Sequence, residues 1–148
     1  MNPYESDGEA HTPQLASFWA RFMAAFLDGL ITFIVSLFIF TLLRVFFPYN
    51  PQEQSTFILL NVFGVLLNWI YYAGLESSVY QATLGKQMMG IFVTDEMGER
   101  MTLARATVRH FSKIISAIIF LIGYLMAAFT PQRQALHDMI ARTLVYRY

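Results

Sequence analysis

The segment from Phe22 to Leu43 (FMAAFLDGLITFIVSLFIFTLL) is apolar throughout except for one ionisable residue, Asp28, and Arg21 stands directly before it. A helix needs about 17 to 25 apolar residues to cross the hydrocarbon core of a bilayer. A carboxylate inside such a helix costs about 2.5 to 3.5 kcal/mol on insertion scales, so Asp28 requires a partner, a water-filled cavity or a proton. The segment therefore predicts a membrane helix with a polar site near its start.

Two further segments have a similar character. Thr56 to Leu75 (TFILLNVFGVLLNWIYYAGL) carries no charge and ends in aromatic residues that suit the membrane interface. Ile114 to Phe129 (IISAIIFLIGYLMAAF) is uncharged but just under the lower length limit for a span. With 56% hydrophobic and only 14% charged residues, the chain lies outside the soluble range, in which about a quarter of residues are charged. These features indicate an integral membrane protein.

The connecting segments predict how the spans are arranged. Residues 46–55 (FFPYNPQEQS) contain two prolines and no basic residue, which favours a tight turn and an antiparallel hairpin of the first two spans. Residues 90–103 (GIFVTDEMGERMTL) combine a β-prone run with turn residues and a polar return. We therefore expect an all-α membrane protein, a small bundle of about three transmembrane helices with a short surface hairpin between the second and third.

The N-terminal residues 1–17 are polar and have no basic region before the first apolar segment. A secretory signal peptide begins with such a basic region and ends in a cleavage site, so the first span is interpreted as a retained helix. We expect residues 1–17 to form a disordered tail and residues 18–148 to form the transmembrane domain.

Basic residues predict the orientation, because Lys and Arg accumulate in cytoplasmic loops. A cytoplasmic N-terminus places Arg21, Lys86, Arg100, Arg105, Arg109 and Lys113 inside. Three spans would then export the tail that carries Arg133, Arg142 and Arg147. A re-entrant third segment, which its marginal length allows, would instead keep this tail inside.

Arg105, Arg109 and Lys113 recur every four residues and share one face of a predicted helix that begins near Thr102. Two interpretations remain open. The three side chains can reach anionic lipid headgroups, each contributing about 1 kcal/mol. Alternatively, one of them is the partner of a buried carboxylate.

Several function classes are disfavoured. Ten basic and ten acidic residues give no net positive charge, so nucleic acid is not an expected partner. The chain has no cysteine, and its three histidines do not form a metal-binding pattern. His137 and Asp138 are neighbours that point about 100° apart on a helix and lack further ligands. Residues 85–87 (GKQ) do not complete a phosphate-binding loop. No catalytic constellation is recognisable, so no enzyme activity, metal or cofactor is expected.

Three motifs together resemble those of the RDD family of small bacterial membrane proteins. They are RFMAAFLDGLI at 21–31, QATLGKQMMGIFVTDEMGERMTLARATVRH at 81–110 and QALHDMIARTLVYR at 134–147. The family is named for one arginine and two aspartates, which the resemblance places at Arg21, Asp28 and Asp138. It implies a multi-pass protein of the bacterial inner membrane. The family is mostly uncharacterised, with ion or solute transport suggested for some members.

Arg21 and Asp28 share a helix face, but their Cα atoms are about 10 Å apart at 1.5 Å per residue. Ion pairs along a helix form at three or four residues, so each group is expected to contact another segment. We predict that Asp138 approaches Arg21. We also predict that Asp28 faces a polar group of the second or third span, with Asn61 and Asn68 as amide candidates. Arg105 and Arg109 are further possible polar partners.

Two functions are compatible with these residues. One is ion or small-solute transport through a polar intramembrane site around Asp28, which requires a homo-oligomer or a membrane protein partner because three spans are few. The other is a non-catalytic scaffold or accessory subunit in which the Arg and Asp residues are structural. The lipid bilayer, including anionic headgroups, is the expected environment in both.

Overall fold

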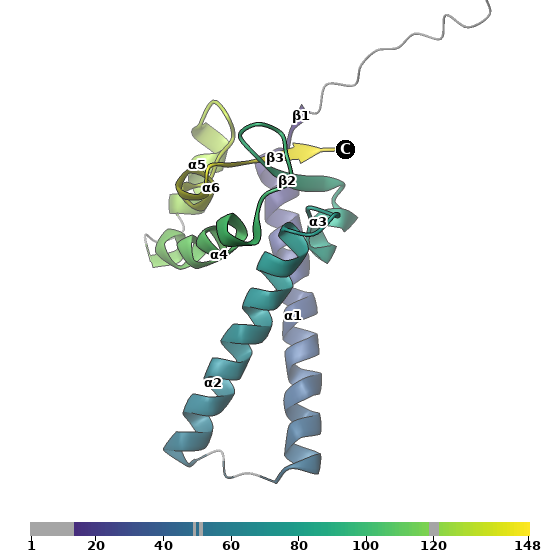
Figure 1. The fold of residues 1–148 in the computed structure, drawn as a ribbon, viewed down its shortest axis with the longest axis vertical. Coiled ribbons are helices and arrows are strands. Elements are labelled where there is room, and N and C mark those ends of the chain that lie inside the picture. The colour runs from purple at the N-terminus through teal and green to yellow at the C-terminus, as the bar shows by residue number, and fades with distance from the viewer. Residues whose placement is uncertain (1–13, 49, 51, 119–121) are drawn as a thin grey trace, which may run out of the picture.

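The computed structural model describes residues 14–48, 50, 52–118 and 122–148. Two long helices form a V that is open at the turn between them, and shorter helices with a small sheet form a cap where the two helices come together (Figure 1). The first, α1 (Phe18–Phe46), begins after Ser17, whose hydroxyl accepts a hydrogen bond from the backbone N of Ala20. The second, α2 (Gln54–Trp69), continues into a π-helical turn, η1 (Ile70–Gly74).

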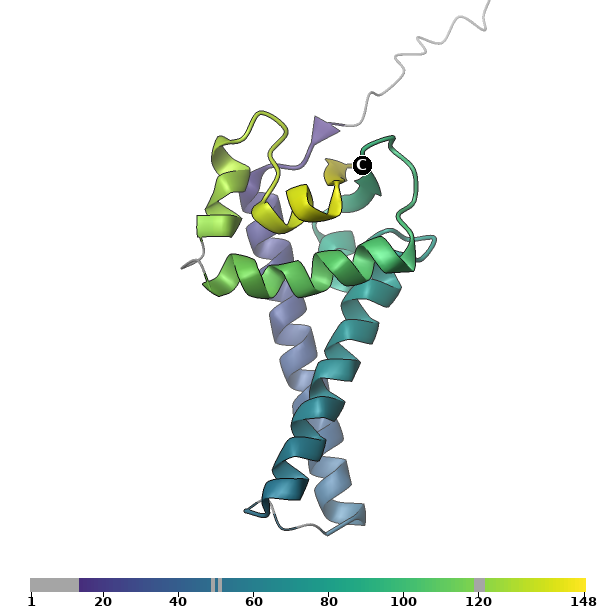
Figure 2. The ribbon, with the colours of Figure 1, turned by 60° about the vertical axis from the view of Figure 1, so that its left-hand side comes forward.

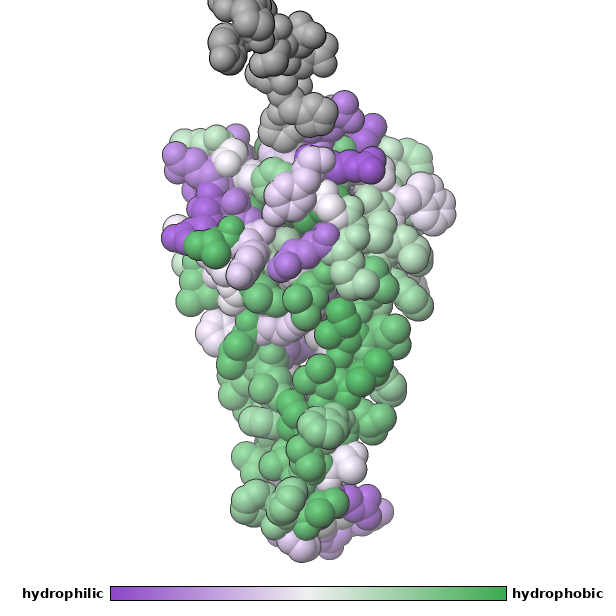
Figure 3. All heavy atoms as spheres, turned by 90° about the vertical axis from the view of Figure 1, so that its right-hand side faces the viewer, coloured by the Kyte–Doolittle hydropathy of each residue, from purple (hydrophilic) through white to green (hydrophobic). Residues whose placement is uncertain are grey.

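Both long helices, α1 and α2 with η1, are long and apolar enough to cross a membrane. Almost none of their most apolar part is buried within the protein, so these side chains are not the core of a water-soluble domain. Figure 3 shows a continuous apolar belt over the two helices, with polar residues at the turn and at the cap. The first two predicted spans therefore coincide with two candidate membrane helices.

The three-span bundle is not confirmed. Within the described residues, the third predicted segment is divided between α4 (Leu103–Ile118) and α5 (Ile122–Phe129), and residues 119–121 lie outside the description. Figure 2 shows α4 crossing the V rather than running along it. The reason is the amphipathic character of α4, which buries Arg109 and Ser112 against the cap while Phe111 and Ile114 are exposed. A helix with one polar face is suited to lie at an interface.

The surface hairpin is also not confirmed. The β-prone run forms strand β2 (Ile91–Asp95), and the predicted turn closes with a hydrogen bond from Asp95 N to Glu99 O. However, β2 pairs with the C-terminal strand β3 (Thr143–Arg147), with Val93 opposite Val145. The pairing with this distant strand is favourable because it buries both valines.

The third strand, β1 (Gln14–Leu15), pairs with β3 on its other side and completes a sheet of order β1-β3-β2. These two residues belong to the predicted tail, whose residues 1–13 lie outside the described part. Since β1 directly precedes α1 and pairs with β3, the start of α1 and the C-terminal strand lie at the same end of the V (Figure 1). This pairing disagrees with the export of the C-terminal tail by three spans.

Two short helices complete the cap and connect it to the long ones. Helix α3 (Leu84–Met88) packs on α1, and α6 (Leu136–Ala141) packs on α4. The buried apolar cluster beneath the sheet is made of small residues and a few larger ones: Ala16, Ala24, Ala73, Ile91, Val93, Met101, Ala106 and Val145. The small side chains of Ala24, Ala73 and Ala106 let α1, η1 and α4 approach closely, and this brings polar side chains from these helices together.

Candidate functional site

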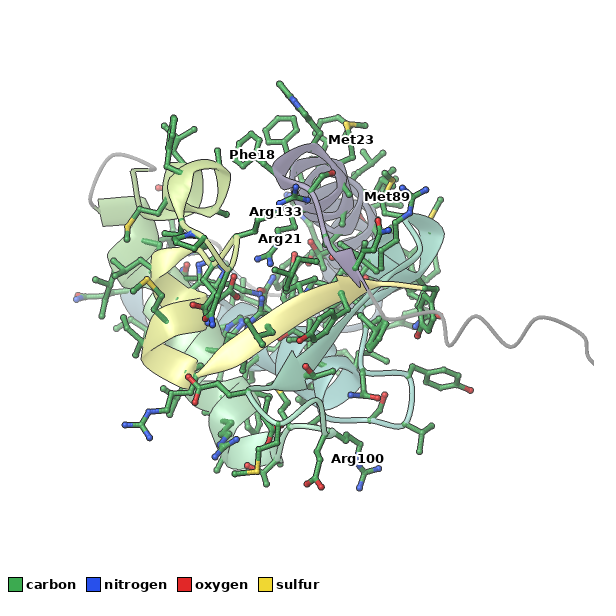
Figure 4. The ribbon with its side chains drawn as sticks, turned by 90° about the horizontal axis from the view of Figure 1, so that it is seen from above. Phe18, Arg21, Met23, Met89, Arg100 and Arg133 are labelled. Atoms are coloured by element: carbon green, nitrogen blue, oxygen red, sulfur yellow. The ribbon has the colours of Figure 1, made fainter. Side chains whose placement is uncertain are left out.

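Six ionisable side chains meet where the cap joins the V, and we call them the charge cluster: Arg21, Glu76, Lys86, Arg109, Lys113 and Asp138. They come from α1, the segment after η1, α3, α4 and α6. Figure 4 looks down on the cap and shows Arg21 pointing from α1 toward the centre, while Phe18 and Met23 point outward. The cluster joins both ends of the sequence to its middle.

Asp138 lies at one side of the cluster and has no exposed surface. Its Oδ2 is 2.5 Å from Arg21 Nη1, and its Oδ1 is 2.5 Å from Arg109 Nη2 and 2.9 Å from Arg109 Nε. The contact predicted between Arg21 and Asp138 is therefore present. Burial alone would raise the pKa of Asp138, but Arg109, His137 and Arg21 outweigh it and hold this pKa far below the ordinary value.

Arg109 connects the two buried carboxylates. Besides its bonds to Asp138, its Nη1 donates to Glu76 Oε2 over 2.6 Å, and the side chain is almost fully buried. Burial alone would lower the pKa of Arg109, but Glu76 and Asp138 together raise it. Two interpretations of the basic residues on α4 were left open, and Arg109 agrees with the second: it is the partner of buried carboxylates.

Glu76 is the second acceptor and was not identified from the sequence. It binds Lys86 as well as Arg109, and Lys113 Nζ lies 3.5 Å away. Burial would raise the pKa of Glu76, but the three cations hold it well below the ordinary value. Burial lowers the pKa of Lys86 to about 7, against the attraction of Glu76. The available signal was the position of Glu76, the first charge after the uncharged second span.

Arg105 is separate from the cluster. It pairs with Asp95 beside the turn after β2, with Nη1 2.9 Å from Oδ2, and its side chain is 45% exposed. A pair whose cation is exposed to solvent in this way contributes about 0 to 1 kcal/mol. Sequence spacing alone could not distinguish Arg105 from Arg109, because both lie on the same helix face.

Asp28 is only 1% exposed and accepts three hydrogen bonds from uncharged donors. Tyr71 Oη lies 2.7 Å from Oδ1, Gly85 N lies 2.8 Å from Oδ1, and Thr83 Oγ1 lies 2.5 Å from Oδ2. The carboxylate thus joins α1 to η1 and to the start of α3. Three donors of this kind stabilise a charged carboxylate inside a protein.

The prediction that Asn61 or Asn68 contacts Asp28 is wrong, although Tyr71 does belong to the second predicted span. Asp28 lies level with Tyr71, which is ten residues, or about 15 Å, beyond Asn61 along the helix. Asn61 instead donates to Phe57 O within α2, over 2.7 Å. Asn68 lines the cavity described below.

Gly85 allows this close approach of α3 to α1. A Cβ atom at position 85 would lie 2.4 Å from Ala24 O and 2.8 Å from Asp28 Oδ1. Any other residue would therefore push α3 away from α1. The sequence showed only that Gly85 is not part of a phosphate-binding loop. Its close contact with α1 could not be predicted, because a single glycine does not indicate which distant segment packs against it.

A cavity of about 1000 Å³ lies between α1, α2 and α4. Its cap end is lined by Arg21, Asp28 and Lys113, and its membrane end by Asn61 and Asn68. The remaining wall is mostly aromatic and aliphatic. In the described part of the chain, no group of three or more His, Cys, Asp or Glu residues could hold a metal ion.

His137 lies beside Asp138 but is not placed to bind a metal. Burial lowers the pKa of His137 to about 3, against the opposing effect of Asp138. The ring is therefore neutral at physiological pH, and its Nδ1 lies 3.3 Å from Ser116 Oγ. This contact holds α6 against α4.

Comparison with known proteins identifies relatives of this chain and its family. The chain is 34% identical over 145 residues to the uncharacterized protein YxaI of Bacillus subtilis (strain 168), covering 88% of this chain and 95% of that one. It is 30% identical over 142 residues to the uncharacterized membrane protein YteJ of the same organism, covering 94% and 85%. No solved structure matches the chain significantly. Residues 15–142 match the RDD family, so the chain is a membrane protein that belongs to this family.

Proposed function

We propose that the protein takes part in moving an ion or small solute across the cell membrane, as one member of a larger assembly. The observation that supports this function is the cavity of about 1000 Å³, which extends from the charge cluster to the amides of Asn61 and Asn68 in α2. Polar side chains inside membrane segments commonly line substrate or ion pathways. Asp28 and Arg21 lie on the wall of this same cavity.

An assembly is required because two spans cannot surround a pathway. In Figure 1, α1 and α2 lie apart at the turn and come together toward the cap, and the apolar faces of both are exposed. A second copy of this chain or another membrane protein would close the open side. The function therefore includes a homo-oligomer or a membrane protein partner.

Flux measurements on purified protein in liposomes test this function. We expect proton or alkali-cation flux that falls at least tenfold in Asp28→Asn and in Asn68→Leu, a loss of about 1.4 kcal/mol of transition-state stabilisation. Glu53→Gln, in the turn at the far end of the V, is the matched control and should leave the flux unchanged. A melting temperature for each variant separates lost transport from lost folding. Absence of flux from the folded wild-type protein would contradict the transport function.

A non-catalytic scaffold or accessory subunit is the second candidate, and the contacts of Asp28 favour it. Its carboxylate is already bound by Tyr71, Thr83 and Gly85 of its own chain. In this function, the Arg and Asp residues hold the cap on the V, and the cap binds another protein. The same liposomes distinguish the two functions, because a scaffold gives a folded protein with no flux.

We further propose that both termini are cytoplasmic in the bacterial inner membrane. The cap carries most of the basic residues, whereas the far end of the V has Arg44 and the acidic Glu53. Because the chain has no cysteine, single-cysteine variants report the topology directly. We expect Gln52→Cys to react with a membrane-impermeant maleimide in intact cells and Tyr148→Cys to react only after lysis. Equal labelling of both sites before lysis would contradict this orientation.

A further inference from the structure

The cations of the charge cluster exceed its carboxylates. Among the described residues, the cluster contains four cations and two carboxylates. If the nearby Asp28 is included, there are three carboxylates for the four cations. Arg109 has the best geometry with both Glu76 and Asp138. Arg21 and Lys113 therefore share carboxylates that already bind other cations. Buried charge without its own counter-charge is unfavourable, so a further anion would stabilise this arrangement.

Arg21 also has donors to spare. Its Nε and Nη2 are buried and have no hydrogen-bond partner in the described structure, while Nη1 is used by Asp138. Arg133, which Figure 4 shows near Arg21, and Arg109 are both close enough to repel its guanidinium. A guanidinium with two free N–H groups is well suited to a phosphate, which accepts two parallel hydrogen bonds.

Lys113 is a second available cation on the same cavity wall. Its Nζ is 3.5 Å from Glu76 Oε1 and 4.2 Å from the centroid of the Tyr72 ring. These contacts leave an ammonium group, which has three donors, without a short ion pair of its own. Arg21 and Lys113 therefore face the same cavity from α1 and α4.

Apart from the amides of Asn61 and Asn68, the wall of the cavity at the membrane side of these cations is mostly apolar. Phe22 and Phe26 of α1, Val65 of α2 and Ile114 of α4 line it, and all four side chains are more than 50% exposed. A free phosphate ion would leave this surface uncovered. The volume of about 1000 Å³ is at the upper end for small-ligand pockets. Cationic groups above an apolar cavity match an amphiphile with an anionic head.

We propose that this cavity binds one phospholipid with a net negative headgroup. The phosphate accepts hydrogen bonds from Arg21 Nε and Nη2 and from Lys113 Nζ. The acyl chains lie under α4 between α1 and α2. The lipid supplies the missing counter-charge and covers the apolar walls. This site does not depend on the transport function, because a scaffold would bind the same lipid.

Native mass spectrometry of the full chain tests the proposal. Protein released from detergent is titrated with phosphatidylglycerol, phosphatidylcholine or inorganic phosphate. We expect one phosphatidylglycerol per chain, bound about tenfold more tightly than phosphatidylcholine, which corresponds to about 1.4 kcal/mol. Lys113→Gln should remove most of this preference. Ala25→Phe, which fills the cavity below the cations, should weaken binding of both lipids.

Matched controls place the same changes elsewhere. Arg44→Gln removes a cation at the far end of α1, and Ala104→Phe adds the same ring to the exposed side of α4; both should bind like wild type. Equal binding of the two lipids, binding of inorganic phosphate alone, or unchanged binding in Lys113→Gln and Ala25→Phe would each overturn the proposal. Lipid binding by Arg21→Gln is measured as well. Because this variant also loses the ion pair with Asp138, its melting temperature is measured to check that the cap is still folded.

Discussion

Arg109→Ala is expected to destabilise the protein by about 3 to 5 kcal/mol, the cost of removing one partner from a buried ion pair. Arg109 is 2% exposed and is the side chain that binds both Glu76 and Asp138. Without it, two buried carboxylates lose their best-placed cation, and α6 loses its charged contact with α4. Thermal unfolding in detergent, with the yield of monodisperse protein, measures the effect.

Arg105→Ala is the matched control for this prediction. Arg105 lies one helical turn before Arg109 on the same helix, and its side chain is 45% exposed. The same substitution there should cost about 1 kcal/mol or less. Arg109→Lys keeps the charge but not the forked geometry, so it should recover only part of the stability. Equal losses for Arg105→Ala and Arg109→Ala would show that the cluster contributes no more than a surface pair.

The long-range contact between Arg21 and Asp138 could be predicted from the sequence because it depends on simple physical requirements. An arginine and an aspartate seven residues apart cannot satisfy each other along one helix. The resemblance to the RDD family then supplied Asp138 as a further aspartate. The identity of the partner of Asp28 could not be predicted in this way, because it depends on which residues of α2 and η1 lie at the same height as Asp28 in α1.

The third predicted span shows a different limit. Hydropathy measures only the length and apolar character of residues 114–129. It does not take into account that Arg109 and Ser112, which precede this segment on the same helix, prefer polar partners. Once Glu76 and Asp138 bind Arg109, α4 is held across the V. The preference of a polar helix face for buried partners thus outweighed the marginal apolar length of residues 114–129.

The strand pairing could not be predicted either. The sequence of β2 and the turn after it favours a local hairpin, because a short loop costs little entropy. The structure instead pairs β2 with β3, where Val93 and Val145 are both buried. Burial of side chains from distant segments decides this pairing, and a single sequence does not show which distant segment is available.

Gly85→Ala is expected to cost about 1 to 3 kcal/mol, the usual range for overpacking a well-packed site. The added methyl group would lie 2.4 Å from Ala24 O, which is backbone in the interior of α1 and cannot rotate away. Helix α3 must then move off α1, and the hydrogen bond from Gly85 N to Asp28 is lost. Thermal unfolding measures the loss, and Gly74→Ala is the control because a Cβ there would meet nothing within 4 Å.

Combining Gly85→Ala with Asp28→Asn separates the two contacts of the glycine. If the carboxylate were the critical neighbour, a change at position 28 would relieve part of the cost. The shorter contact is with Ala24 O, which Asp28→Asn leaves in place, so the cost of Gly85→Ala should be the same in both backgrounds. A cost that disappears in the Asp28→Asn background would show that the Asp28 side chain, rather than the backbone of α1, sets how closely α3 can pack.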